Sequence, residues 1–201
     1  MKIYIIHYGP IFEGAHADRP TMNSISLKLS LILLLAVLMT GCRKNPVVSD
    51  RQTVLFQMDY VNYASSYQHY GYFIDSDGNV LTYYNPEKWN FPDRELRISA
   101  GQIAENLTMC SNAGIKISKD DLLKYSGHIK YIAATKVTAM KNAADNAGST
   151  EYICFQLSEN SEMYKGAIIR TEGNFTCENL NFFSRRVAEW MKTISVKIPV
   201  K

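Results

Sequence analysis

The stretch YGYFIDSDGNVLTYY, residues 70–84, predicts a β-hairpin at the centre of the fold. Residues 70–75 and 80–84 are rich in aromatic and branched apolar residues, which favour strands. Between these two runs, Asp77 is followed by Gly78. Asp-Gly between such runs is a strong hairpin signal, because glycine accepts the positive φ angle that a tight turn demands.

Outward from the hairpin, the sequence contains apolar patterns with the period of a strand and others with the period of a helix. Strands are therefore expected at residues 53–60, 151–158 and 164–171, and helices at 99–110, 118–125, 128–142 and 180–194. The strands cluster instead of alternating singly with helices, which favours an α+β fold over a doubly wound one. We expect an antiparallel sheet of about four to five strands packed against three to four helices.

Composition and charge exclude several classes of protein. The 201 residues are 46% hydrophobic and 20% charged, which is typical of a globular chain and not of a disordered or collagen-like one. The formal net charge is +3, and adjacent basic residues occur only at Arg43–Lys44 and Arg185–Arg186. Because nucleic-acid binding needs a clustered basic face, we expect no nucleic-acid partner.

An apolar run near the N-terminus indicates export from the cytoplasm. Leu29–Met39 reads LSLILLLAVLM and is preceded by Lys28. A membrane-spanning helix needs about 20 apolar residues, so this run has the length of a signal-peptide core instead. Thr40, Gly41 and Cys42 follow it. The small side chains let a peptidase approach the backbone closely, and the cysteine thiol can carry a lipid.

The segment Met39–Cys42 resembles the lipobox of bacterial lipoproteins, although Met39 stands where that family most often has leucine. The resemblance implies that Cys42 carries diacylglycerol and fatty acids such as palmitate, and that the chain is cut just before it. The protein would then be a lipoprotein anchored to a membrane of the bacterial cell envelope, with its domain outside the cytoplasm. Three acyl chains exceed the two hydrophobic signals that stable anchoring needs.

The chain is expected to have three parts. Residues 1–41 are interpreted as a signal peptide with a spurious N-terminal extension. Native translation is expected to start at Met22, because this start gives a signal peptide of normal proportions and residues 1–21 do not fit one. Residues 42–51 are polar, contain a proline and are expected to be a lipidated tether. Residues 52–201 then form a single α+β domain, a length that fits one domain.

Few residues of the mature chain are suited to catalysis. Its histidines are His69 and His128, and beyond the tether its cysteines are Cys110, Cys154 and Cys177, to which the sequence assigns no disulfide pairing. The sequence lacks the common nucleophile, zinc, phosphate-loop and dinucleotide motifs, so we expect neither a cofactor nor a metal. The alternative function is a small envelope hydrolase that uses a Cys or Asp with His69 or His128.

The acidic turn Asp75–Asn79 invites comparison with a calcium-binding loop. An EF-hand loop has glycine at its sixth position and an acidic residue at its twelfth, whereas here Gly78 is fourth and Pro86 is twelfth. A hairpin turn explains these residues better than a calcium site does.

Aromatic density is the most unusual feature of the sequence. Ten aromatic residues lie in the 32 residues from Tyr60 to Phe91, whereas the whole chain is 11% aromatic. Strand alternation places Tyr70 and Tyr72 on one face of the sheet and Phe73 on the other. Displayed Tyr and Trp bind sugars, peptides or proteins, so we expect Tyr70, Tyr72 and Trp89 to be contact residues and Phe73 to be a core residue. Cross-strand aromatic packing without any ligand is the alternative.

The segment YQHYGYFIDSDGNVLTYY, residues 67–84, is similar to hairpins of small uncharacterised envelope lipoproteins of anaerobic gut bacteria. That resemblance favours a stand-alone envelope lipoprotein and implies no activity. The function expected from the sequence is therefore a membrane-anchored, non-enzymatic binding module for an envelope protein or a glycan. A structural or immunity-type protein without a small ligand is a third interpretation.

Overall fold

The computed structural model describes residues 49, 51–64, 66–158 and 162–198 of the chain. These residues lie in one compact unit. The expected signal peptide, the start at Met22 and the lipidated Cys42 fall outside the described residues.

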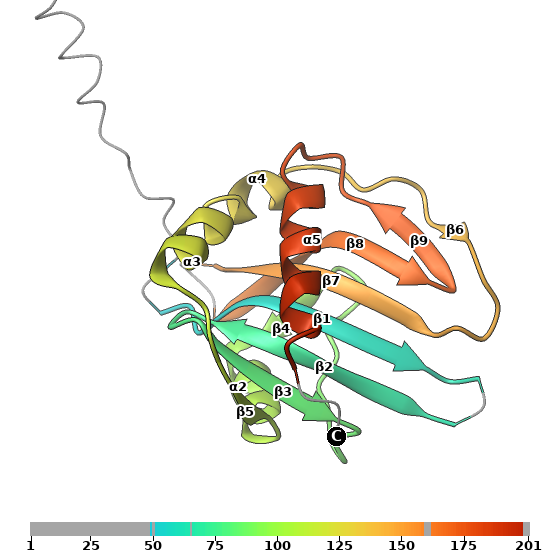
Figure 1. Cartoon of the computed structure of the whole chain (residues 1–201), viewed down its shortest axis with the longest axis horizontal. Coiled ribbons are helices and arrows are strands. Elements are labelled where there is room, and N and C mark those ends of the chain that lie inside the picture. Colours follow the sequence, from blue (N-terminus) through green and yellow to red (C-terminus); the bar gives the residue numbers. More distant parts are fainter. Residues whose placement is uncertain (1–48, 50, 65, 159–161, 199–201) are drawn as a thin grey trace, which may run out of the picture. The chain divides into compact units, whose positions relative to one another are not determined.

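An antiparallel sheet organises the described residues (Figure 1). It has nine strands in this part of the chain, in the order β5-β3-β2-β1-β7-β8-β9-β6, with β4 paired to β8. The strands are β1 (Val54–Asn62), β2 (Gln68–Asp75), β3 (Asn79–Tyr84), β4 (Arg97–Ser99), β5 (Ser111–Lys116), β6 (Lys141–Asn142), β7 (Ser149–Leu157), β8 (Met163–Gly173) and β9 (Phe175–Glu178). The α+β class and the antiparallel sheet are confirmed, but the sheet is larger than the four to five strands expected.

The hairpin expected at residues 70–84 is formed by β2 and β3. In its turn, Asp75 Oδ1 accepts hydrogen bonds from the backbone N–H groups of Asp77 (3.0 Å) and Asn79 (2.7 Å). Gly78 has a φ of +84°, a left-handed conformation that glycine adopts at no steric cost. The carboxylate of Asp75 thus binds the backbone of its own turn, which agrees with the hairpin interpretation of this acidic segment.

Four helices are present in the described part of the chain: α2 (Ala100–Thr108), α3 (Lys119–Ser126), α4 (Ile129–Ala133) and α5 (Ser184–Ser195). Two of them begin at the caps that the sequence predicts. The Ser99 side chain accepts from the Gln102 backbone N–H while the Gln102 side chain accepts from the Ser99 N–H, which is a complete capping box. At the start of α3, the Ser118 side chain accepts a hydrogen bond from the Asp121 backbone N–H.

Both faces of the sheet are covered, and each cover makes its own hydrophobic core. Helices α3, α4 and α5 pack on one face, where α5 crosses the strands (Figure 1) and buries Val187 and Met191 against the sheet. On the opposite face, Ile103 of α2 and Ile98 of β4 pack over Phe73 of β2. Side chains in the middle of the central strands therefore meet a helix or loop rather than solvent.

The helix expected at residues 128–142 is wrong beyond Ala133. After α4 the chain becomes extended: Val137 bridges Asn179, and β6 pairs with β9. The Thr138 N–H donates to the Glu178 carbonyl at 2.8 Å, so a hydrogen bond that a helix would make locally is made across strands. The β9 edge supplies these partners, and such tertiary pairing overrides the weak helical pattern of this β-branched segment.

Candidate functional site

The structure places Tyr72 in the hydrophobic core. Tyr72 is fully buried on the α5 side of the sheet, and its hydroxyl donates to the Met191 carbonyl at 2.7 Å. The expectation that Tyr72 is displayed is therefore wrong, because α5 covers the face onto which strand alternation directs it. Phe73, on the opposite face, is fully buried as expected.

Tyr70 is the middle ring of a three-tyrosine ladder. Tyr60, Tyr70 and Tyr84 lie directly opposite one another on β1, β2 and β3. Ring centroids are 4.5 Å apart between Tyr60 and Tyr70 and 6.2 Å apart between Tyr70 and Tyr84, with interplanar angles of 27° and 19°. The Tyr70 ring thus stacks on Tyr60 and on Tyr84, which is cross-strand aromatic packing. The outermost ring, Tyr84, is 63% exposed.

Trp89 packs over the face of the sheet that α2 also covers. Its ring centroid lies 4.2 Å from that of Tyr83, 5.2 Å from that of His69 and 5.8 Å from that of Phe73. Trp89 is half-buried, and most of its ring contacts belong to the core on this side. Of the three expected contact residues, the structure thus leaves Tyr70 and Trp89 partly accessible and Tyr72 inaccessible.

Exposed aromatic side chains gather where β1 ends and β2 begins. Tyr63 is 75% exposed and Tyr67 is 46% exposed, and their ring centroids are 5.5 Å apart. Phe91, 44% exposed, approaches the same end from the loop after β3, because both its ring and that of Tyr67 contact His69. We call this region the aromatic end and define it by Tyr60, Tyr63, Tyr67, Tyr70, Tyr84 and Phe91. It takes in both sides of the sheet at this end, because Tyr70 and Tyr84 lie on the side of Tyr72 and α5, whereas Tyr67 and Phe91 contact His69 on the side of Phe73 and Trp89. Sequence reasoning chose only Tyr70 of this group.

A buried polar network adjoins the aromatic end. His69 is fully buried, and its Nε2 lies 2.8 Å from Asp59 Oδ1. The same carboxylate oxygen accepts the Tyr83 hydroxyl at 2.5 Å, and Gln57 Nε2 donates to that hydroxyl at 2.9 Å. Burial, together with the charge of Asp59, raises the pKa of Tyr83 well above its usual value, so the phenol keeps the proton that it donates.

The second ring nitrogen of His69 is buried without a partner. Nδ1 has no hydrogen bond among the described residues, and the rings of Tyr67, Tyr83, Trp89 and Phe91 lie with centroids 5.1–6.1 Å from the imidazole. A general base needs its free nitrogen within hydrogen-bond reach of the proton that it takes. In this conformation Nδ1 is enclosed, so the His69–Asp59 pair is oriented like a catalytic dyad but closed to a substrate.

Asp59 also belongs to a polar row that crosses the sheet. In register with it on successive strands are Glu151, Thr171 and Cys177. Glu151 is half-buried, and burial and the nearby charge of Asp59 raise its pKa. Sequence reasoning missed Asp59 and Glu151. The signal available for Asp59 is a single charge inside the otherwise apolar or neutral strand of residues 54–62.

The cysteine–histidine pairs considered for a hydrolase are not assembled. The thiols of Cys110, Cys154 and Cys177 are free, and their hydrogen bonds go to Asn106, Ala167 and Thr171. Burial raises the pKa of Cys110 and of Cys154 to about 12, whereas a nucleophilic thiol needs a lowered pKa. His128 stacks on Phe183, with ring centroids 4.0 Å apart. Of the expected combinations, the structure brings together only His69 and an aspartate in the part of the chain that it describes.

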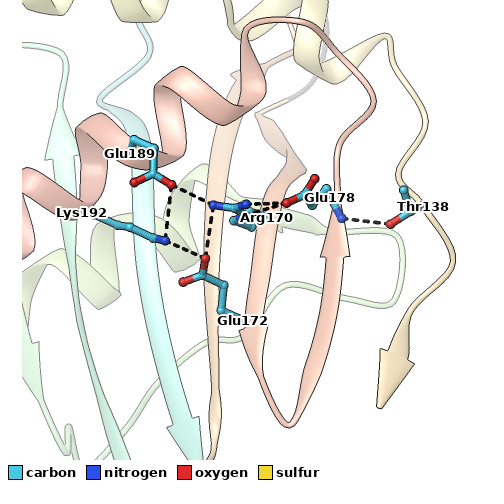
Figure 2. A network of polar contacts seen from close by, with 6 residues as sticks. All are labelled: Thr138, Arg170, Glu172, Glu178, Glu189 and Lys192. Carbon is cyan, nitrogen blue, oxygen red and sulfur yellow. Dashed lines mark hydrogen bonds and ion pairs between the residues drawn. The ribbon is translucent and has the colours of Figure 1, made fainter. Parts of the chain in front are cut away.

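A charged network ties α5 to the sheet (Figure 2). Arg170 of β8 pairs with Glu178 of β9 and reaches Glu189 of α5 at 2.9 Å. Lys192 of α5 closes the network through Glu172 at 2.7 Å. The Arg170 side chain is only 16% exposed, so its partners satisfy a largely buried guanidinium. The network joins three elements and is a structural clamp.

Within the described ranges, no group of three or more His, Cys, Asp or Glu side chains is arranged to hold a metal ion. None of the helices in those ranges has both the length and the apolar character needed to cross a bilayer.

Comparison of the chain with protein-family models, with curated proteins and with solved structures gives no significant match.

Proposed function

We propose that this protein is a lipid-anchored component of the bacterial cell envelope and that its domain is a non-enzymatic binding module. The observation that carries the proposal is the aromatic end. Tyr63, Tyr67, Tyr84 and Phe91 come from three separate segments, yet all are more than 40% exposed. Three further rings of the described residues are exposed, at Tyr131, Phe175 and Phe182. The aromatic end gathers four exposed rings at one end of the sheet, and such a group favours a contact surface.

The chemistry of this surface suits binding rather than catalysis. A tyrosine ring offers a large contact area at a small conformational cost, and its hydroxyl adds a hydrogen bond. Cross-strand packing holds Tyr84 against Tyr70, and the Tyr63 ring lies against Tyr67. The exposed rings are therefore partly pre-ordered, which lowers the entropy lost when a ligand binds.

The anchor is proposed from Cys42 and the apolar run before it. Metabolic labelling of cells with an alkyne fatty acid tests it. The wild-type protein should take up the label and sediment with membranes, whereas Cys42→Ser should remain unlabelled and uncut. Equal labelling of both proteins would rule out the lipoprotein assignment.

Binding is tested by photo-crosslinking on intact cells. A diazirine amino acid is placed at Tyr63, and in a matched control at Tyr131, which is 49% exposed on α4 and remote in sequence from the aromatic end. We expect adducts from position 63 and none from position 131, because only the first lies on the contact surface. Equal adduct yields from the two positions, or none from position 63, would contradict the binding function.

A small envelope hydrolase that uses Asp59 with His69 is the second candidate. The contact of 2.8 Å between His69 Nε2 and Asp59 Oδ1 favours it, since a carboxylate that orients an imidazole is a recurring part of hydrolytic sites. Purified protein is assayed on ester, amide and glycoside substrates beside Asp59→Asn. Turnover that Asp59→Asn abolishes while the protein stays folded would establish this candidate over the binding module.

A further inference from the structure

The aromatic end is almost free of ionic charge. The segments 60–74 and 79–86, which carry Tyr60, Tyr63, Tyr67, Tyr70 and Tyr84, contain no Asp, Glu, Lys or Arg. Between the tyrosines stand amide and hydroxyl side chains, including the exposed Ser66 and Asn85 and the half-buried Asn62 and Gln68. The surface therefore offers ring faces and neutral hydrogen-bonding groups.

Few charges approach this surface from neighbouring segments. Asp59 is buried and bound to His69 and Tyr83. Residues 143–148 lie beside the ladder, because the Tyr60 hydroxyl donates to the Ala147 carbonyl at 3.1 Å, and Asp145 is the charged residue of that segment. Glu87 and Lys88 precede Phe91 and have opposite signs. Beside Tyr60, Glu172 pairs with Lys192, and Glu172 is in register with Thr150, which is in register with Tyr60. The neighbouring charges are thus of both signs, so long-range attraction does not select the ligand.

On this basis, and resting on the proposed binding function, we infer that the aromatic end binds a neutral, hydroxyl-rich glycan chain. The C–H face of a sugar ring packs on an exposed tyrosine ring, and the sugar hydroxyls pair with phenol, amide and hydroxyl groups around it. The open rings of Tyr63 and Tyr84 are the stacking positions. The hydroxyls of Tyr70 and Tyr84, which form no hydrogen bonds with other described residues, are available to the ligand.

The test uses the lipidated full chain in lipid nanodiscs, with three probes. These are a panel of neutral polysaccharides (glucans, mannans and xylans), an anionic polysaccharide such as carboxymethyl cellulose, and phosphatidylcholine vesicles. We expect retention on at least one neutral polysaccharide, unchanged between about 50 and 500 mM salt because no ion pairs are involved. The double variant Tyr63→Ser/Tyr84→Ser should bind at least about tenfold more weakly. The control variant Tyr131→Ser should bind like wild type.

The other outcomes separate the inference from the function on which it rests. Salt-sensitive binding to the anionic polysaccharide alone, or binding to the vesicles alone, overturns the neutral-glycan inference. Adducts from position 63 on cells, combined with no retention on any polysaccharide, also overturn it but leave the binding function standing, with a protein as the partner. Loss of both the adducts and the retention removes the binding function itself.

Discussion

Tyr83 reaches Asp59 by passing over Gly71, which lies between them in register on the intervening strand. A Cβ atom on Gly71 would overlap the Tyr83 ring and the backbone carbonyl of Met58. Because glycine has no side chain, the Tyr83 hydroxyl lies 2.5 Å from Asp59 Oδ1, which also binds His69. The polar network thus depends on a glycine in the middle of a central strand, a position where glycine by itself weakens the sheet.

The first prediction is that Gly71→Ala disrupts the network and the fold together. The new methyl group must displace backbone as well as a ring, so we expect a loss of about 3 kcal/mol in the free energy of unfolding. Urea denaturation measures it. Gly101→Ala, the same substitution at an exposed site in α2 where the new methyl group meets only the Ser99 hydroxyl at 3.9 Å, should instead stabilise by up to about 1 kcal/mol. Equal effects at the two glycines would contradict the close approach of Tyr83.

The second prediction separates core tyrosines from surface tyrosines. Tyr72→Ala and Phe73→Ala should each cost about 3–5 kcal/mol, since both side chains are fully buried on opposite faces of β2. Tyr84→Ala should change stability by no more than about 0.5 kcal/mol, because its ring is mostly exposed. Thermal and urea unfolding of the three variants gives the comparison. A Tyr72→Ala protein as stable as wild type would show that α5 does not cover this face.

The third prediction concerns pH. The pKa of Glu151 is raised by burial and by Asp59, so its proton binds more tightly in the folded state than in the unfolded state. The protonated Glu151 carboxyl therefore adds to the free energy of unfolding at a pH below its ordinary pKa of 4.5. This stabilisation is lost as the pH rises through the folded-state pKa. Glu151→Gln should have a higher Tm than wild type at neutral pH, and the difference should vanish in acid.

Glu87→Gln provides the matched control, since Glu87 is exposed in the loop after β3. Its Tm difference from wild type should be small and nearly independent of pH. A Glu151→Gln variant that gains most in acid, or that behaves like Glu87→Gln, would show that Glu151 is not held in a desolvated site beside Asp59.

The fourth prediction is that the domain thiols react slowly in the native state. Burial raises the pKa of Cys110 and of Cys154 to about 12, and Cys177 is 4% exposed. At about pH 8 a disulfide reagent should modify the three thiols only as fast as the protein opens, and should modify all three rapidly in denaturant. If one thiol reacted at once in the native protein, that result would contradict the prediction and would support a nucleophilic cysteine.

Much of the secondary structure followed from local patterns. The hairpin at residues 70–84, the strands that became β1, β7 and β8, and the caps at Ser99 and Ser118 are encoded within a few residues of where they form. Residues 134–142 carry a helical pattern but are extended, because their hydrogen-bonding partner, β9, lies about 40 positions later in the sequence. Helical periodicity can be read in one segment, whereas strand pairing requires two.

The candidate site was less predictable than the fold. Alternation correctly placed Tyr72 and Phe73 on opposite faces, but it carries no information about whether a face is covered. Tyr72 is buried because it contacts α5, and the α5 residue whose carbonyl accepts its hydroxyl, Met191, is 119 positions away in the sequence. The pairing of His69 with Asp59 is hidden from the sequence for the same reason, because it joins two strands, and the same carboxylate oxygen also accepts from Tyr83 of a third strand.

The sequence by itself determined the class of fold, the central hairpin and the expectation of a lipid anchor at Cys42, because strand alternation, turn chemistry and an apolar run before a cysteine are all local properties. Tertiary structure alone decided that Tyr72 is core, that Tyr63 and Tyr84 face solvent, and that Asp59, His69 and Tyr83 share one network. Exposure and contact depend on which distant segments pack over a residue, and that is settled only when the helices dock on the two faces of the sheet.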